Sequence, residues 1–153
     1  SASGEMKPGN EPGIEIRAKY TVLGEGCRGH LGKEIIAKYN LSDDKDPQHY
    51  GIGFKEVWKL KDEVYEPGLV MHTNGWPTPL DTPSGSYFYH GENNEAYVGY
   101  VIPLDYKNPH LSPFDEFQKW KTHPSIKKYL EGAERLSYGA RALIREVFNP
   151  YLN

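Results

Sequence analysis

The stretch that decides the fold is GSYFYH at residues 85–90, followed by YVGYVIPL at residues 97–104. Residues 85–90 are rich in aromatic side chains, which is typical of a β-strand. Residues 97–104 are almost continuously apolar, as expected of a central strand that is covered on both faces. Two further strands are predicted upstream, at residues 51–60 and 69–75.

The most regular alternation in the chain lies further towards the N-terminus, at residues 14–23. Apolar and polar residues take turns there, which is the period-2 pattern of a half-buried strand. The apolar positions are Ile14, Ile16, Ala18, Tyr20 and Val22. A glycine-rich turn at residues 24–29 follows, and the apolar residues after it fall at helical spacing. The unit is therefore predicted to be a strand, a glycine turn and a helix.

Helices are predicted after the last strand. Ser112 is a suitable N-cap, with Pro113 in the first turn of the helix it begins. Pro124 ends this helix, and Ser125 is expected to cap a short second one. An amphipathic C-terminal helix is indicated by Ala140, Leu143, Ile144, Val147 and Phe148. The predicted fold class is α+β, with an antiparallel or mixed sheet of about five strands and helices packed on one side.

The composition limits the class of protein. The 153 residues fit one domain, which we expect at residues 13–153, after a flexible tail or cloning remnant at residues 1–12. The 18 Lys and Arg residues nearly balance the 21 Asp and Glu residues, which argues against a nucleic-acid-binding protein. No apolar run approaches the ~20 residues that span a bilayer, so we expect a soluble chain.

Cys27 is the single cysteine of the sequence. One cysteine excludes an internal disulfide and a cysteine-ligated iron–sulfur cluster, which needs about four thiolates. The six histidines show no metal-binding spacing. We therefore predict no catalytic residue and no metal site in this chain.

The glycine turn at residues 24–29 allows two interpretations. A turn between a strand and a helix can hold a phosphate at the N-terminus of the helix. The glycines do not follow the dinucleotide fingerprint, and the lysine that follows does not complete a Walker loop. Spacing alone therefore favours a structural turn over a phosphate site.

The aromatic side chains of the predicted strands and helices also allow two interpretations. They can form the core, or they can line a flat apolar pocket for a benzoquinone ring. Because side chains alternate along a strand, one face can be core while the other lines a site. The set is Trp76, Tyr87, Phe88, Tyr89, Tyr97, Tyr100, Phe114, Phe117 and Trp120.

The order of several motifs resembles the electron transfer flavoprotein–ubiquinone oxidoreductases. The matching strings extend from about residue 13 to residue 143. They are TVLGEGCRGHL (21–31), YGIGFKEVW (50–58), HTNGWP (72–77), LDYKNP (104–109), LSPF (111–114), KTHP (121–124) and YGARAL (138–143).

The resemblance implies a membrane-surface enzyme with an FAD domain, a 4Fe–4S domain and a ubiquinone domain, of which this chain resembles the ubiquinone domain. Such an enzyme passes electrons from reduced electron transfer flavoprotein to ubiquinone at the bacterial or mitochondrial inner membrane. By this resemblance, Glu25, Gly26 and Arg28 face the FAD. The resemblance places the quinone headgroup at Ser84, Gly85 and Ser86, where the family has a Tyr-Gly-Gly-Ser turn.

The chain departs from the family pattern in three respects. No dinucleotide fingerprint precedes residue 13, the cluster cysteines are absent, and Pro83 and Ser84 replace the Tyr and the first Gly of the quinone turn. We therefore expect an excised or redesigned piece that has no turnover alone and carries no cofactor itself. Two alternatives stay open: the substrate domain of a related isoprenoid-lipid reductase, and a scaffold without a ligand.

Overall fold

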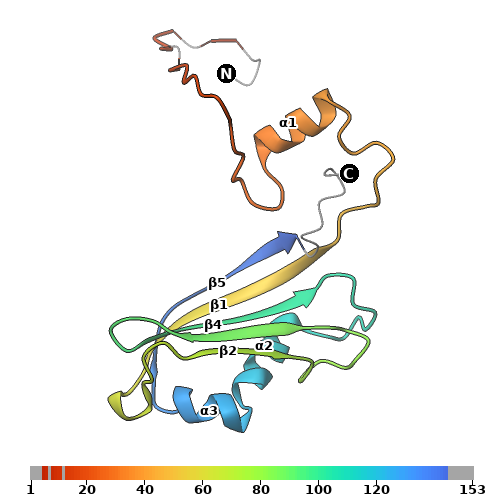
Figure 1. The fold of residues 1–153 in the computed structure, drawn as a ribbon. Helices are drawn as coiled ribbons and strands as arrows, with labels where there is room; N and C mark the ends of the chain where they lie inside the picture. The colour runs from red at the N-terminus through yellow and green to blue at the C-terminus, as the bar shows by residue number, and fades with distance from the viewer. Residues whose placement is uncertain (1–4, 7, 12, 145–153) are drawn as a thin grey trace.

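A computed structural model of the chain describes residues 5–144 except 7 and 12 (Figure 1). Five antiparallel strands form one open sheet in the order β2-β3-β4-β1-β5. The strands are β1 (Tyr50–Lys59), β2 (Val70–Asn74), β3 (Gly85–His90), β4 (Glu95–Pro103) and β5 (Glu134–Ile144). The helices are α1 (His30–Lys38), the 3₁₀ turn η1 (Asp62–Val64), α2 (Pro113–Lys121) and α3 (Pro124–Leu130). This architecture is compatible with the predicted α+β class.

The core lies on one face of the sheet, and β4 is the central strand, as predicted. Every second side chain of β4 is buried, because side chains of a strand alternate between the faces. The buried residues are Ala96, Val98, Tyr100 and Ile102. The opposite side chains of β4 are less covered: Tyr97 and Val101 are half-buried. The prediction that this strand is covered on both faces is therefore correct for one face only.

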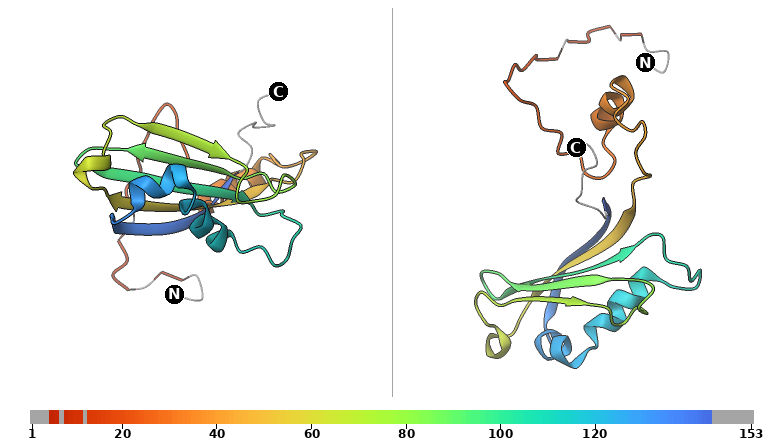
Figure 2. Two further views of the ribbon diagram at one scale, coloured as in Figure 1. Left: turned by 90° about the horizontal axis from the view of Figure 1, so that it is seen from below. Right: turned by 45° about the vertical axis from the view of Figure 1, so that its right-hand side comes forward.

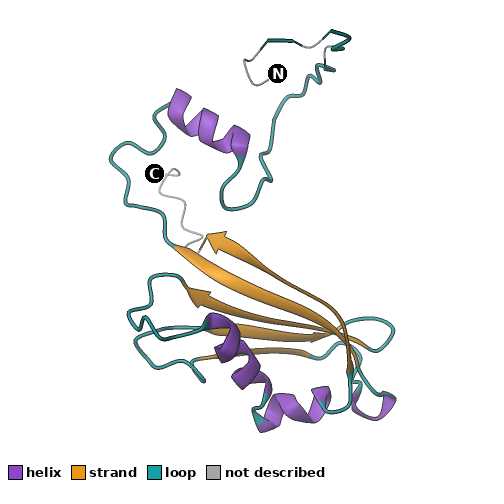
Figure 3. Cartoon of the chain, turned by 180° about the vertical axis from the view of Figure 1, so that it is seen from behind, coloured by secondary structure: helices purple, strands orange, loops and turns teal. Residues whose placement is uncertain are grey.

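Helices α2 and α3 lie against this face of the sheet (Figure 3). Their aromatic side chains Phe117, Trp120 and Tyr129 belong to the buried core. The Phe117 ring of α2 stacks on Tyr100 with 6.1 Å between the ring centroids. The Tyr129 ring of α3 lies 5.3 Å from Phe88 of β3. Each of these five side chains is at most 5% exposed.

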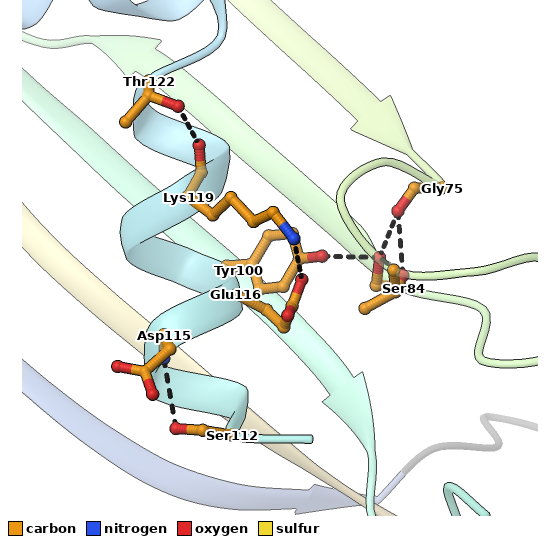
Figure 4. Close-up of polar contacts among 9 residues, drawn as sticks. Gly75, Ser84, Tyr100, Ser112, Asp115, Glu116, Lys119 and Thr122 are labelled. Carbon is orange, nitrogen blue, oxygen red and sulfur yellow. Dashed lines mark hydrogen bonds and ion pairs between the residues drawn. The ribbon is translucent and has the colours of Figure 1, made fainter. Parts of the chain in front are cut away.

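The predicted N-cap of α2 is confirmed, whereas that of α3 is wrong. Ser112 Oγ accepts a hydrogen bond from the Asp115 amide at 3.3 Å (Figure 4). In α3, His123 Nδ1 accepts from the Ser125 amide at 3.3 Å, so His123 is the cap. The reason is that Pro124 occupies the first helical position, which proline favours, and the cap is the residue before it.

The strand predicted at residues 14–23 is absent from the described structure. These residues form no ladder, and Ile14, Ile16, Tyr20 and Val22 are 87–92% exposed. An alternating pattern specifies two faces but does not supply the neighbouring strand to which the backbone must bond. The helix predicted after the glycine turn does form, as α1, but it has no buried residue.

The predicted C-terminal helix is also wrong, because residues 134–144 form β5. Ala140, Leu143 and Ile144 lie on this strand, whereas Val147 and Phe148 lie outside the described residues. Figure 2 shows β5 beside β1, and the two strands pair from Tyr50↔Ile144 to Lys59↔Glu134. Short apolar runs are ambiguous between helix and strand, and here the long pairing with β1 outweighs the helical spacing. The number of five strands is thus correct, but β5 takes the place of residues 14–23.

Candidate functional site

A hollow of about 430 Å³ lies at the start of β3, where Gly85 and Ser86 are found. Its wall includes Tyr87, which points away from the core because its neighbours Ser86 and Phe88 are buried. Val101 of β4 pairs with Gly85 and completes the wall. We call this hollow the Gly85 cavity; its other lining residues are His72, Thr73 and Asn74.

A second cavity, of about 530 Å³, adjoins the Gly85 cavity and extends over β1 and β5. The two cavities share Tyr87 and Val101. Gly53 and Gly139 lie among its lining residues, so backbone rather than side chain forms much of its floor. We call it the β5 cavity; its remaining lining residues are Phe54, Lys55, Val57, Ser137, Tyr138, Ala140, Arg141 and Leu143.

Gly99 allows the Tyr87 ring to lie flat between the two cavities. A Cβ atom at Gly99 would lie 2.2 Å from two ring atoms of Tyr87. Burial raises the pKa of the Tyr87 phenol, and the neighbouring Tyr89 contributes to the rise. The Tyr87 hydroxyl is therefore protonated at neutral pH and can donate a hydrogen bond.

Gly85 leaves open space above its own backbone. A Cβ atom at this position would approach nothing closer than the Thr73 carbonyl oxygen, at 3.9 Å. A flat ring can therefore come close to the backbone of β3 at this point.

Ser84 does not line the Gly85 cavity, and its hydroxyl lies beside Gly75 and Tyr100 (Figure 4). Its hydroxyl donates to the Gly75 carbonyl at 2.8 Å and accepts from the Tyr100 hydroxyl at 2.8 Å. Thr78 Oγ1 lies 2.6 Å from Ser84 Oγ and donates to the same carbonyl. Burial raises the pKa of Tyr100, so its phenol stays neutral and acts as the donor. Ser84 therefore supports the turn that leads into β3.

Ser86 is likewise held from the core side. Its hydroxyl is hydrogen-bonded to Thr73 Oγ1 of β2, and Trp120 Nε1 of α2 donates to the same Thr73 oxygen at 2.9 Å. The side chain of Ser86 is 6% exposed. Of the three residues that the resemblance assigns to the quinone, Gly85 and Ser86 line the cavity, and the two serine hydroxyls bond to the protein behind it.

The residues assigned to the flavin side lie at the N-terminus of α1. Glu25 accepts hydrogen bonds from the Gly32 amide at 2.8 Å and from the Leu31 amide at 3.2 Å. These two bonds hold the pKa of the Glu25 carboxyl below its ordinary value. The position that a phosphate would take at this helix end is therefore filled by the chain's own carboxylate. Gly26 has a φ of +80°, which a glycine adopts without strain in such a turn.

Arg28 lines a separate cavity of about 410 Å³ near the Tyr50 end of the sheet. Cys27, His49 and Asp105 also line it, and His49 Nδ1 lies 3.5 Å from Asp105 Oδ2. Arg28 and the residues assigned to the quinone therefore line different cavities, whereas Glu25 and Gly26 line none of the cavities described.

The residues present do not fit an iron–sulfur cluster. The chain contains one cysteine, and the described residues contain no group of three or more His, Cys, Asp or Glu arranged around a metal position. In the same part of the chain, no helix is long and apolar enough to cross a bilayer.

Sequence reasoning missed the cavity over β1 and β5. The sequence does carry a pattern that indicates this cavity. Glycines at alternate positions of a strand leave one face of the strand without side chains, so that another molecule can come close to the backbone. Gly51 and Gly53 alternate in this way on β1, and Gly139 faces Lys55 across the ladder. That signal has meaning only once β5 is known to be a strand.

Residues 50–143 match the protein family described as "ETF-QO, ubiquinone-binding". The chain is 56% identical over 138 residues to an electron transfer flavoprotein-ubiquinone oxidoreductase of Pseudomonas aeruginosa, a match that covers 90% of this chain and 25% of the relative. It is 54% identical over 147 residues to a probable enzyme of the same name in Acinetobacter baylyi (95% and 26% of the two chains). It is 50% identical over 142 residues to the mitochondrial enzyme of Sus scrofa (92% and 23%). The chain therefore spans about a quarter of the length of the curated relatives it matches. These matches favour neither of the two alternative interpretations, the substrate domain of an isoprenoid-lipid reductase and the scaffold without a ligand.

Proposed function

Because this chain belongs to the ETF-QO, ubiquinone-binding family, we propose that its uncovered sheet face binds the ring of ubiquinone beside Gly85. The observation that carries this proposal is the pair of adjoining cavities that share Tyr87 and Val101. A pocket for a small organic ligand usually measures about 300–1,000 Å³, a range that includes both volumes.

The chemistry of the wall suits a quinone. A quinone ring is flat and apolar, and its two carbonyl oxygens only accept hydrogen bonds. Tyr87 offers an aromatic ring and a protonated hydroxyl, and Asn74 offers amide donors in the same cavity. The open backbone at Gly85 lets the ring approach closely, and Val101 supplies apolar contact.

The relatives' printed names suggest the wider role. We propose that this chain supplies the acceptor pocket of an enzyme that passes electrons from an electron transfer flavoprotein to ubiquinone. A bound FAD supplies the redox chemistry in such an enzyme, and the protein positions it. Glu25, Gly26 and Arg28 then belong to the flavin side, and the 4Fe–4S cluster is held by cysteines that this chain lacks.

The division of the sheet into two faces supports this arrangement. Helices α2 and α3 occupy one side of the sheet, which leaves the cavity side for the part of the enzyme that carries the flavin. We propose residues 13–153 as one such unit, without turnover alone, which works at a membrane surface because its quinone is a membrane lipid.

The test is an amide NMR titration of the isotope-labelled chain with a short-chain ubiquinone. Saturable shifts are expected at Gly85, Ser86 and Tyr87. In Gly85→Val, the new side chain starts from a Cβ position that contacts nothing closer than 3.9 Å, so binding should be lost while the fold is kept. Val70→Ile is the matched control, since Val70 lies on the same face of the sheet but lines neither cavity. Scattered shifts, or equal binding by Gly85→Val, would contradict the proposal.

A further inference from the structure

Two cations, Lys55 and Arg141, stand on the cavity side of the sheet, one level or more from the acidic residues Glu95 and Glu134 on the same face. Lys55 of β1 pairs with Gly139 of β5, and Arg141 of β5 pairs with Gly53 of β1. Both side chains therefore lie on the same face as Tyr87, on neighbouring strands. Among the described residues that point to this side between the levels of Gly51 and Val57, none is Asp or Glu. This is notable because the whole chain has more acidic than basic residues.

The same two cations are free of ion pairs within the described part of the chain. No carboxylate of the described residues lies within 4.0 Å of Lys55 or Arg141. The Lys55 ammonium lies 5.6 Å from the centre of the Tyr97 ring, so it leans over the sheet.

The core side of the same strand behaves in the opposite way. Glu56, the next residue of β1, is 3% exposed and pairs with Lys121 at 2.8 Å and with Arg135 at 3.4 Å. On that side both cations share a carboxylate partner within 4.0 Å. On the cavity side, positive charge is left available to a ligand.

We propose that Lys55 and Arg141 make the β5 cavity select the negatively charged form of a planar quinone. The chemical class is an ionised hydroxyquinone or a singly reduced quinone, in which an oxygen carries the charge. This inference rests on the proposed function, because the β5 cavity continues the Gly85 cavity through Tyr87 and Val101. A cation beside an apolar wall attracts such an oxygen more strongly than it does in bulk water, because the local dielectric constant is lower.

The test compares two probes with the same naphthoquinone ring. 2-Hydroxy-1,4-naphthoquinone is ionised at neutral pH, and 2-methyl-1,4-naphthoquinone is neutral. Their dissociation constants are measured by NMR titration with the full 153-residue chain at low salt. The ionised probe is expected to bind about tenfold more tightly, and Lys55→Met or Arg141→Gln should each weaken it by about three- to fivefold. The neutral probe should change by less than about twofold, since it carries no charge for the cations to attract.

Lys59→Met is the matched control. Lys59 lies on the same face of β1, but it pairs in register with Glu95 and Glu134 and lines neither cavity. This variant should leave both dissociation constants unchanged. The inference is overturned, while the proposed function stands, if the neutral probe binds and the ionised probe binds no more tightly than the neutral one. It is also overturned if Lys59→Met weakens binding of the ionised probe as much as Lys55→Met or Arg141→Gln does. If neither probe nor ubiquinone binds, the proposed function fails as well.

Discussion

Gly99→Ala should displace the Tyr87 ring, which lines both cavities, and thereby change the shape of both. The new Cβ would lie 2.2 Å from two ring atoms and 2.6 Å from the Tyr87 hydroxyl oxygen. Carbon atoms pack at about 3.5–4.0 Å, so the ring must move by roughly 1.5 Å. The ring is the far end of a side chain, and a shift of this kind costs about 1 kcal/mol through the altered side-chain torsions. A gain of about 0.5–1 kcal/mol from replacing glycine in a strand offsets much of this cost.

The free energy of unfolding should therefore stay within about 1 kcal/mol of the parent value, while quinone affinity falls about tenfold, which corresponds to ~1.4 kcal/mol. Urea denaturation measures the first quantity and an NMR titration with a short-chain ubiquinone the second. Gly91→Ala is the matched control, because its Cβ would lie 2.4 Å from the Tyr97 ring, which lines neither cavity. Unchanged Tyr87 ring signals with parental affinity in Gly99→Ala would refute the reasoning, as would an equal loss of binding in Gly91→Ala.

Three further predictions concern stability. Lys121→Met removes the closest cation of the buried Glu56 carboxylate and should lower the free energy of unfolding, measured by urea denaturation, by about 3 kcal/mol. The double variant with Glu56→Gln should recover much of that loss, because the buried charge is then removed as well. Burial lowers the pKa of His90, whose Nδ1 lies 2.9 Å from both the amide nitrogen and the carbonyl oxygen of Glu66. The unfolded chain therefore takes up the proton at a higher pH than the folded chain, and the free energy of unfolding should fall as pH drops below 6.5, with a smaller slope in His90→Gln. Ser112→Ala removes the cap of α2 and should cost about 1 kcal/mol, whereas Ser112→Asp should cost little.

Local patterns predicted the elements whose own residues determine their conformation. The central strand β4 was identified by its apolar run, and α2 by the cap and first-turn proline at Ser112 and Pro113. In both cases the signal and the structure it specifies lie within the same ten or so residues. The strands β1, β2 and β3 were found in the same way, to within one residue at each end.

The two errors in the sheet come from pairing between distant segments. The spacing from Ala140 onward predicts a helix, but residues 140–144 belong to β5, which pairs with β1 along the whole length of β1. Residues 14–23 have a better strand pattern than β5, yet they have no neighbour among the described residues. A strand is completed by its partner, and no property of the segment alone identifies that partner.

The candidate site was accessible from the sequence only in part. Gly85 and Ser86 were assigned through the resemblance, and the structure places both in one cavity. The orientation of Ser84 into a buried network could not be read from its position in a turn. Lys55 and Arg141 escaped notice because they share a face only through the register between β1 and β5.

The hydrogen-bonded series Trp120, Thr73 and Ser86 connects α2 through β2 to β3 directly behind the Gly85 cavity. Its order depends on the core and not on any molecule in front of it. Association with a flat ring therefore loses little conformational entropy of the protein, since the backbone is already fixed. The amides of β2 and β3 should exchange with deuterium equally slowly with and without quinone. Differences in affinity among quinones then reflect the rings and their substituents, since the protein does not have to rearrange to receive them.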